Sequence, residues 1–183
     1  VHFSPESIDI IKGSPSNRRK FFDQLISQIR SSYLQNFQNY DSILKQRNEL
    51  LKSIRDGKTP KELIEPWNIQ IAETGTYIML ERKKMVKKIA KLAKSKHYQL
   101  TQDKEELDIY YNPSIDSIPG VNQSKFNNDN SDIKDSDLKE AYLKKLDSVL
   151  RRDINIGTTT VGPHRDNFDI LIDGFEAKRF CSQ

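Results

Sequence analysis

The chain has 183 residues, of which 35% are hydrophobic and 31% are charged, and its net charge is +4. Typical soluble domains have about 45–50% apolar and about 25% charged residues, so this composition favours elongated helices with a narrow buried seam over one compact globule. The single cysteine, Cys181, excludes an intramolecular disulfide and a cysteine-based zinc site, and it fits a reducing cytosol. No apolar run approaches the roughly 18 residues of a membrane span, so we expect no membrane partner.

The first residues carry strand and helix signals. Val1–Phe3 predicts the end of a short strand. Ser4-Pro5 then predicts a helix start, with serine as the N-cap and proline in the first turn, and Gly13 is expected to end that helix. Ser14-Pro15 repeats the start signal and predicts a second helix.

Two long helices are predicted from apolar residues at three- and four-residue spacing. The first covers about Tyr33–Arg55, and its apolar stripe is broken only by Arg47. The second covers about Pro66–His97. Stripes of this width favour packing of the two helices as an antiparallel hairpin. Gly75 costs about 1 kcal/mol in helix propensity, so we expect it to mark a close contact.

The second half of the chain mixes strand, loop and helix signals. The alternating segment Leu107–Tyr111 predicts a short strand. Residues 113–136 are rich in Ser, Asn and Asp, which predicts a mobile loop. Asp137 with Glu140 predicts a capping box, at the start of a helix that ends near Arg152.

The last segment predicts two strands around a sharp break. Residues 158–174 are interpreted as a strand, a Gly-Pro break and a second strand, and Asp173-Gly174 is a strong hairpin turn signal. The sequence then stops at Cys181-Ser182-Gln183, in the middle of an element, which suggests a piece of something larger. The predicted fold class is therefore α+β, mainly α with small β parts. We expect residues 1–23 and 156–183 to share a sheet-containing body, with residues 24–155 inserted as a helical arm.

The most basic stretch is Arg82–Lys96, which contains no acidic residue. Helical spacing puts several of its lysines on one side, away from much of the apolar stripe. Ammonium groups in such a row can meet successive phosphates of a polyanion. A solvated helix face without any ligand is an equally good interpretation. The candidate phosphate-binding residues are Arg82, Lys84, Lys87, Lys88 and Lys91.

The second candidate motif is the run Gly162-Pro163-His164-Arg165-Asp166. Gly and Pro predict a turn, and a histidine can act as an acid, a base or a ligand. A lone histidine beside an aspartate is more often a structural hydrogen-bonding group, although a hydrolase using His164 and Asp166 is a further reading. The sequence contains no phosphate-cradling GxxxxGK[ST] loop and no nucleophile elbow. We therefore expect no catalytic residue and no metal site in this chain.

Several motifs follow one another along the chain: Phe3-Ser4-Pro5-Glu6, Gly13-Ser14-Pro15, Arg18-Arg19-Lys20-Phe21-Phe22-Asp23, Gln46-Arg47-Asn48-Glu49-Leu50-Leu51, Trp67, Gly162-Pro163-His164-Arg165-Asp166 and Ser182-Gln183. In this order they resemble the RecF family of bacterial DNA repair and replication proteins, which are ABC/SMC-like ATPases. The resemblance spans nearly the whole chain apart from the polar loop. The chain departs from the family pattern at Ser7 and Asn167, where the family has aspartates.

The resemblance implies a division of the chain. Residues 1–23 would end the first part of an ATPase head, residues 24–155 would form the helical lid or arm domain, and residues 156–183 would return into the head. Ser182 and Gln183 look like the start of the ABC signature motif, which in the full protein would contact the nucleotide of the opposite subunit. His164, Arg165 and Asp166 would form a head motif near the dimer's nucleotide site.

The resemblance also implies a function for the full protein. It would bind ATP and Mg, form an ATP-dependent homodimer, and bind double-stranded DNA and single-strand/double-strand junctions. It would act with RecR and RecO in replication, recombinational gap repair and the SOS response. The full protein would be a weak DNA-dependent ATPase in the cytoplasm, whereas this chain lacks both Walker motifs and should be inactive. The alternative is a helical protein–protein interaction module without a DNA role.

Overall fold

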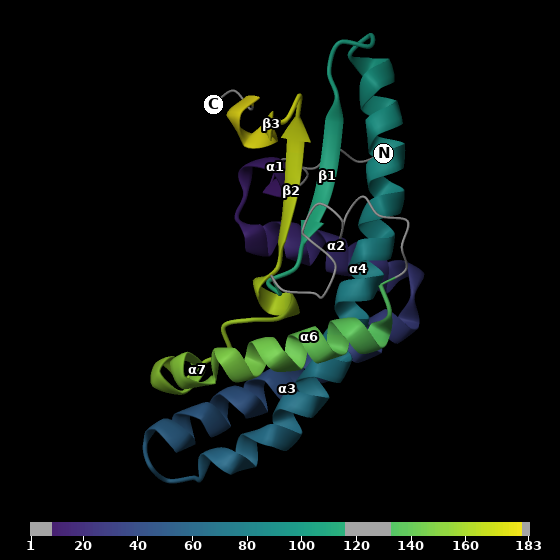
Figure 1. The fold of residues 1–183 in the computed structure, drawn as a ribbon. Helices are drawn as coiled ribbons and strands as arrows, with labels where there is room; N and C mark the ends of the chain where they lie inside the picture. The colour runs from purple at the N-terminus through teal and green to yellow at the C-terminus, as the bar shows by residue number, and fades with distance from the viewer. Residues whose placement is uncertain (1–8, 116–132, 181–183) are drawn as a thin grey trace.

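The computed structural model describes residues 9–115 and 133–180. In this part the chain is mainly helical, with one small antiparallel sheet, as the predicted fold class requires (Figure 1). None of the described helices is long and apolar enough to cross a membrane. In chain order the elements are α1 (Asp9–Lys12), α2 (Pro15–Ile29), α3 (Ser31–Arg55), η2 (Lys61–Ile64), α4 (Glu65–Leu100), β1 (Leu107–Asn112), α6 (Asp135–Ser148), α7 (Leu150–Ile156), η3 (Pro163–Arg165), β2 (Asn167–Ile172), β3 (Phe175–Glu176) and η4 (Ala177–Phe180).

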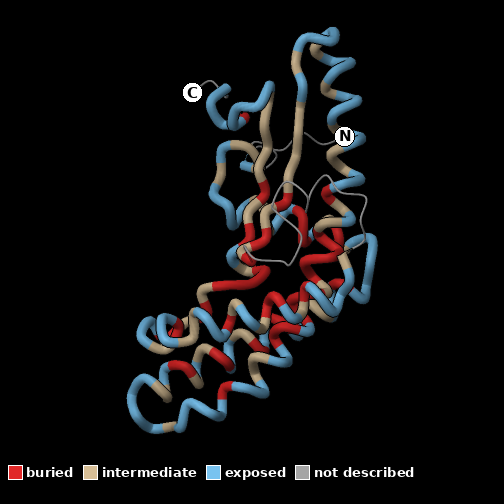
Figure 2. Tube along the Cα trace, viewed as in Figure 1, coloured by how far each residue is buried: buried red, intermediate tan, exposed pale blue. Residues whose placement is uncertain are grey.

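The antiparallel hairpin of α3 and α4 is confirmed, and α6 packs across it (Figure 1). Buried residues concentrate where these three helices meet (Figure 2). Gly75 of α4 lies at the contact: a Cβ there would be 2.6 Å from the Tyr142 ring and 3.2 Å from the Tyr40 ring. The close contact expected at this glycine is therefore confirmed, and it lets two helices approach α4 more closely than a side chain would allow.

The sheet stands beside the upper half of α4, in the order β1-β2-β3 (Figure 1). β1 and β2 are antiparallel, with Tyr111 opposite Phe168, and the predicted Asp173-Gly174 turn joins β2 to β3. Phe22 of α2 stacks on Phe168 with ring centroids 4.3 Å apart. β1 lies within the sequence segment assigned to the arm, yet its partner β2 follows residue 156, so the sheet joins the two segments.

The expected strand after Thr158 is wrong. Backbone amides that would bond to a neighbouring strand are instead satisfied by side chains of the helices. Asn48 accepts bonds from the amide and hydroxyl of Thr159, at 2.8 and 2.7 Å. Asp153 accepts the corresponding bonds from Thr160, at 3.1 and 2.7 Å. This segment is consequently held to α3 and α7 rather than to a sheet.

Two predictions about helix ends also fail. The capping box at Asp137 is wrong, because α6 begins two residues earlier and its N-cap position, Lys134, makes no side-chain capping bond. The helix predicted to end near Arg152 is divided at Val149 and continues to Ile156, where Gly157 ends it in the left-handed conformation. The strand and helix start expected before Asp9, and most of the expected loop at 113–136, lie outside the described residues.

Candidate functional site

The Gly162–Asp166 motif forms a tight turn where the helical arm meets the sheet. Pro163 begins the short helix η3, and the Arg165 amide donates to the Gly162 carbonyl at 2.8 Å. Gly162 has φ +124°, in a region that only glycine adopts readily. Its Cα faces the hydroxyl groups of Tyr40 and Tyr142, which leave no room for a side chain. Arg165 points outward and is exposed.

Arg82 of α4 is the central charge beneath this turn, and its side chain is only 1% exposed. Its guanidinium donates to both carboxylate oxygens of Asp23 at 2.9 Å and to the Pro163 carbonyl at 2.6 Å. It also lies 3.4 Å from the Asp166 carboxylate. Burial alone would lower the pKa of Arg82, but Asp23 and two neighbouring tyrosines outweigh it and raise the pKa well above its ordinary value. One guanidinium therefore links α2, α4 and the turn.

Asp166 connects the same turn to the end of β1. Its carboxylate accepts hydrogen bonds from the Tyr111 hydroxyl and from the Ser114 amide, the latter at 2.7 Å. Burial raises the pKa of Asp166, and Arg82, Tyr111 and Ser114 oppose that rise. Ser114 also donates to the Gly162 carbonyl at 3.1 Å. All these bonds hold the chain in place, and they leave Asp166 no open approach for a substrate.

His164 is held in one neutral tautomer. The Thr159 carbonyl can only accept, so Nε2 carries the proton of the 2.9 Å bond between them. Nδ1 is then the acceptor for the Tyr40 hydroxyl at 2.7 Å. Burial lowers the pKa of His164 to about 4, the Thr159 bond opposes that shift, and Arg165, Arg19 and Arg82 add to it. No hydrogen bond joins His164 to Asp166 among the described residues, so the acid–base pair of a hydrolase is not formed.

Arg47 and Asp153 form a second buried ion pair. Arg47 of α3 is fully buried and bonds to Asp153 at 3.1 Å, Thr159 at 2.6 Å and Asn68 at 2.9 Å. These bonds tie α3, α4 and α7 to the segment that leads into the turn. The sequence held a signal for this role, since Arg47 interrupts an otherwise apolar stripe.

The structure does not support all five of the predicted phosphate-binding residues. Arg82 must be removed from it, because its buried guanidinium is occupied by Asp23, Pro163 and Asp166 and cannot reach a phosphate outside. Lys84 remains exposed but pairs with Glu81 at 3.2 Å. Lys87, Lys88 and Lys91 are exposed on the same helix. Ser182 and Gln183 lie outside the described residues, and the described part contains no group of side chains arranged to hold a metal ion.

The lowered pKa of His164 predicts a pH-dependent stability. Because the unfolded histidine has a pKa of about 6.5, its contribution is present above that pH and is lost as pH falls towards about 4. Between pH 6.5 and 5 the free energy of unfolding should fall by about 1.5 kcal/mol more in the wild type than in His164→Gln, measured by urea denaturation. His97→Gln keeps the His164 ring and should retain most of the wild-type slope. Parallel slopes for the wild type and His164→Gln would contradict the assignment.

The chain is similar to known proteins in both sequence and fold. No protein-family model matches the chain. The DNA replication and repair protein RecF of Natranaerobius thermophilus is 38% identical over 183 residues, which are 100% of this chain and 46% of that protein. RecF of Acetivibrio thermocellus is 34% identical, with the same shares covered. The chain thus spans about half the length of the curated relatives it matches.

The fold gives the same result. A structure of the recombination mediator protein RecF-ATPrS in the RecFOR pathway matches with a TM-score of 0.86 and 32% identity, over 99% of this chain and 45% of that one. A structure of RecF-ATP in the same pathway matches with a TM-score of 0.85. In both sequence and fold, therefore, the chain is similar to about half of a RecF protein.

Proposed function

We propose that this chain is the lid or arm region of a RecF-type protein that acts in DNA replication and recombinational repair. The observation that carries the proposal is the homology over all 183 residues, together with the long α3–α4 hairpin that projects from the sheet. The proposed division stays at residues 1–23, 24–155 and 156–183. The two buried arginine clusters support it, because Arg47 and Arg82 join the arm to residues 159–166, which lead into β2.

In the longer protein we propose ATP binding, with Mg, and an ATP-dependent homodimer. The support is that both matching structures are of RecF with a nucleotide, ATPrS in one and ATP in the other. Ser182 and Gln183 would contribute to the nucleotide site of the opposite subunit. The motif of His164, Arg165 and Asp166 would lie near the same nucleotide site. His164 and Asp166 would have a structural role there, and the exposed Arg165 would lie nearest to the other subunit. RecO and RecR are proposed partners, since the matching structures belong to the RecFOR pathway.

For DNA binding we propose the exposed face of α4 that carries Lys87, Lys88 and Lys91. These lysines follow one another at helical spacing, so successive ammonium groups can meet successive phosphates. Two other lysines of the basic stretch form ion pairs: Lys84 pairs with Glu81, and Lys94 pairs with Glu106 and Asp108. The contact would be with the DNA backbone and would not read its sequence.

A salt titration of duplex binding tests this surface. The Lys88→Glu/Lys91→Glu double variant should bind a DNA duplex at least about tenfold more weakly, and the slope of log affinity against log salt should fall by about 2. A control double variant, Lys45→Glu/Lys144→Glu, makes the same change in net charge on α3 and α6, where both lysines are exposed. If both double variants lose the same affinity, the effect comes from net charge and the proposed α4 surface is wrong.

A further inference from the structure

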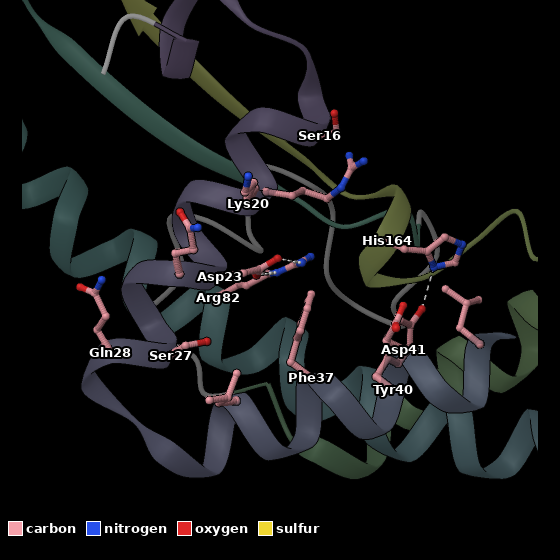
Figure 3. Close-up of a pocket in the computed structure, with 14 residues that line it drawn as sticks. Ser16, Lys20, Asp23, Ser27, Gln28, Phe37, Tyr40, Asp41, Arg82 and His164 are labelled. Carbon is pink, nitrogen blue, oxygen red and sulfur yellow. Dashed lines mark hydrogen bonds and ion pairs between the residues drawn. The ribbon is translucent and has the colours of Figure 1, made fainter. Parts of the chain in front are cut away.

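A groove between α2 and α3 has no role in the function proposed above. Its volume is about 750 Å³, and it opens where the two helices diverge from Arg30. Its floor is formed by Arg82, His164 and Tyr40, and Phe37 points into it from α3 (Figure 3). From Ser16 to Gln28, the first and last residues of α2 that line the groove, the helix rises about 18 Å at 1.5 Å per residue, which matches slightly more than three turns of a helix lying in the groove.

One wall of the groove is apolar and partly open to solvent. Leu34, Phe37 and Leu44 lie along one side of α3, and all three line the groove. The Leu34 side chain is 42% exposed, and Phe37 and Leu44 are half-buried. Apolar residues at three- and seven-residue spacing on a groove wall are suited to the apolar stripe of an amphipathic helix.

The other wall is polar and cationic at its open end. Arg19 and Lys20 lie on α2, and among the described residues neither forms an ion pair with a carboxylate. The acidic residues of the groove are already compensated, Asp23 by Arg82 at 2.9 Å and Asp41 by Lys45 at 2.6 Å. Arg19 donates to the Asp166 backbone carbonyl at 2.8 Å, and this neutral acceptor does not cancel its charge. Burial and the nearby Arg82 lower the pKa of Arg19, and Asp166 and Asp23 oppose that shift.

We propose that this groove docks an acidic amphipathic helix of a partner protein, with its acidic end beside Arg19 and Lys20 and its apolar stripe on Leu34, Phe37 and Leu44. The charge complementarity at the open end and the apolar wall behind it favour this occupant. A groove for single-stranded nucleic acid would combine cations along its length with several stacking aromatic rings. Here the cations without an ion pair among the described residues, Arg19 and Lys20, stand at one end only, and of the two aromatic rings that line the groove, Phe37 and Tyr40, the second is buried. The proposal does not depend on the DNA surface, which lies on α4.

The test uses the whole 183-residue chain and a fluorescent peptide of about 14 residues. The peptide carries glutamates in its first turn and leucines at three- and four-residue spacing. Glutamates near the N-terminus interact favourably with the helix dipole and so stabilise the helical form of the peptide. We expect saturable binding by fluorescence anisotropy, and changes in the amide NMR signals of Leu34, Phe37 and Leu44. Leu34→Glu and Lys20→Glu should each weaken binding at least about tenfold, a loss of about 1.4 kcal/mol. Matched exposed positions on η2, Leu63→Glu and Lys61→Glu, should change it less than about twofold.

Several results would overturn the proposal. A shuffled peptide of the same composition that binds equally well would show that the apolar stripe is not recognised. A peptide with lysines in place of the glutamates that binds equally well would show that charge is not recognised. Absence of binding at about 1 mM peptide would also exclude the site. A thymidine oligonucleotide that displaces the peptide from the groove would identify a nucleic-acid surface instead. Concentration-dependent dimerisation that Leu34→Glu abolishes would show that a second copy of this chain occupies the groove.

Discussion

Replacing Arg82 by methionine should lower the free energy of unfolding by about 3–5 kcal/mol, because it leaves two buried carboxylates without their cation. Asp23 is only 7% exposed and Asp166 only 1%, so water cannot compensate either charge. The variant also loses the bond from Arg82 to the Pro163 carbonyl. Urea denaturation followed by far-UV circular dichroism gives the difference directly.

The control for this prediction lies on the same helix. Lys88→Met removes an exposed cation from α4 and should change the free energy of unfolding by less than about 0.5 kcal/mol. Adding Asp23→Asn to Arg82→Met should restore part of the loss, since the amide oxygen still accepts from the Tyr33 hydroxyl and only the Asp166 carboxylate remains buried without its cation. A loss below about 1 kcal/mol in Arg82→Met would mean that the cluster does not hold the arm to the sheet.

Gly162→Ala is the second large effect, with an expected loss of about 3–5 kcal/mol. The backbone conformation at φ +124° is strained for alanine, which costs about 1–3 kcal/mol. The new methyl group would overlap the Tyr142 hydroxyl and lie 2.6 Å from the Tyr40 hydroxyl. Relief of that overlap requires the rings to move, which adds a further cost of about 1–3 kcal/mol. The same movement breaks the bond from Tyr40 to His164.

Two further variants separate the backbone term from the overlap. Gly57 also has a positive φ, +72°, but nothing lies within 4 Å of its Cβ position, so Gly57→Ala should lose only about 1–2 kcal/mol. Tyr142→Phe removes the overlapping oxygen and should recover part of the loss in Gly162→Ala. Thermal denaturation of the wild type, Gly162→Ala, Gly57→Ala and the Gly162→Ala/Tyr142→Phe double variant measures the cost of the backbone conformation and the cost of the overlap. Equal losses at Gly57 and Gly162 would show that the tyrosine hydroxyls do not constrain the turn.

The helical framework followed from local patterns. The spacing of apolar residues predicted α3, α4 and their antiparallel pairing, because a helix stripe must be buried whatever the surrounding fold. The alternation of Leu107–Tyr111 and the Asp173-Gly174 turn likewise predicted β1 and the hairpin of β2 with β3. Prediction failed at Thr159 and Thr160, whose amides bond to side chains distant in sequence, Asn48 and Asp153.

The candidate site was less accessible to sequence reasoning. The motif at Gly162–Asp166 was recognisable as a turn, but its partners lie on α2, α3, α4 and β1. Arg82 illustrates the difficulty: in the sequence it begins a run of basic residues, and only the fold shows that it faces Asp23 and Asp166 rather than solvent. The groove between α2 and α3 was not predicted, because its two walls come from different helices and the angle between them is set by the turn at Arg30.

By itself, then, the sequence determined the mainly helical class, the long hairpin and the resemblance to RecF, since these depend on periodicity and on motifs local in the chain. Only the tertiary structure decided which charges are buried and which face solvent. The reason is physical: a charged side chain has the same local pattern in either place, and its role depends on carboxylates and carbonyls brought near by folding. The Gly162–Asp166 turn is the clearest case, because its residues form a motif local in the sequence, whereas their contacts lie on four other elements.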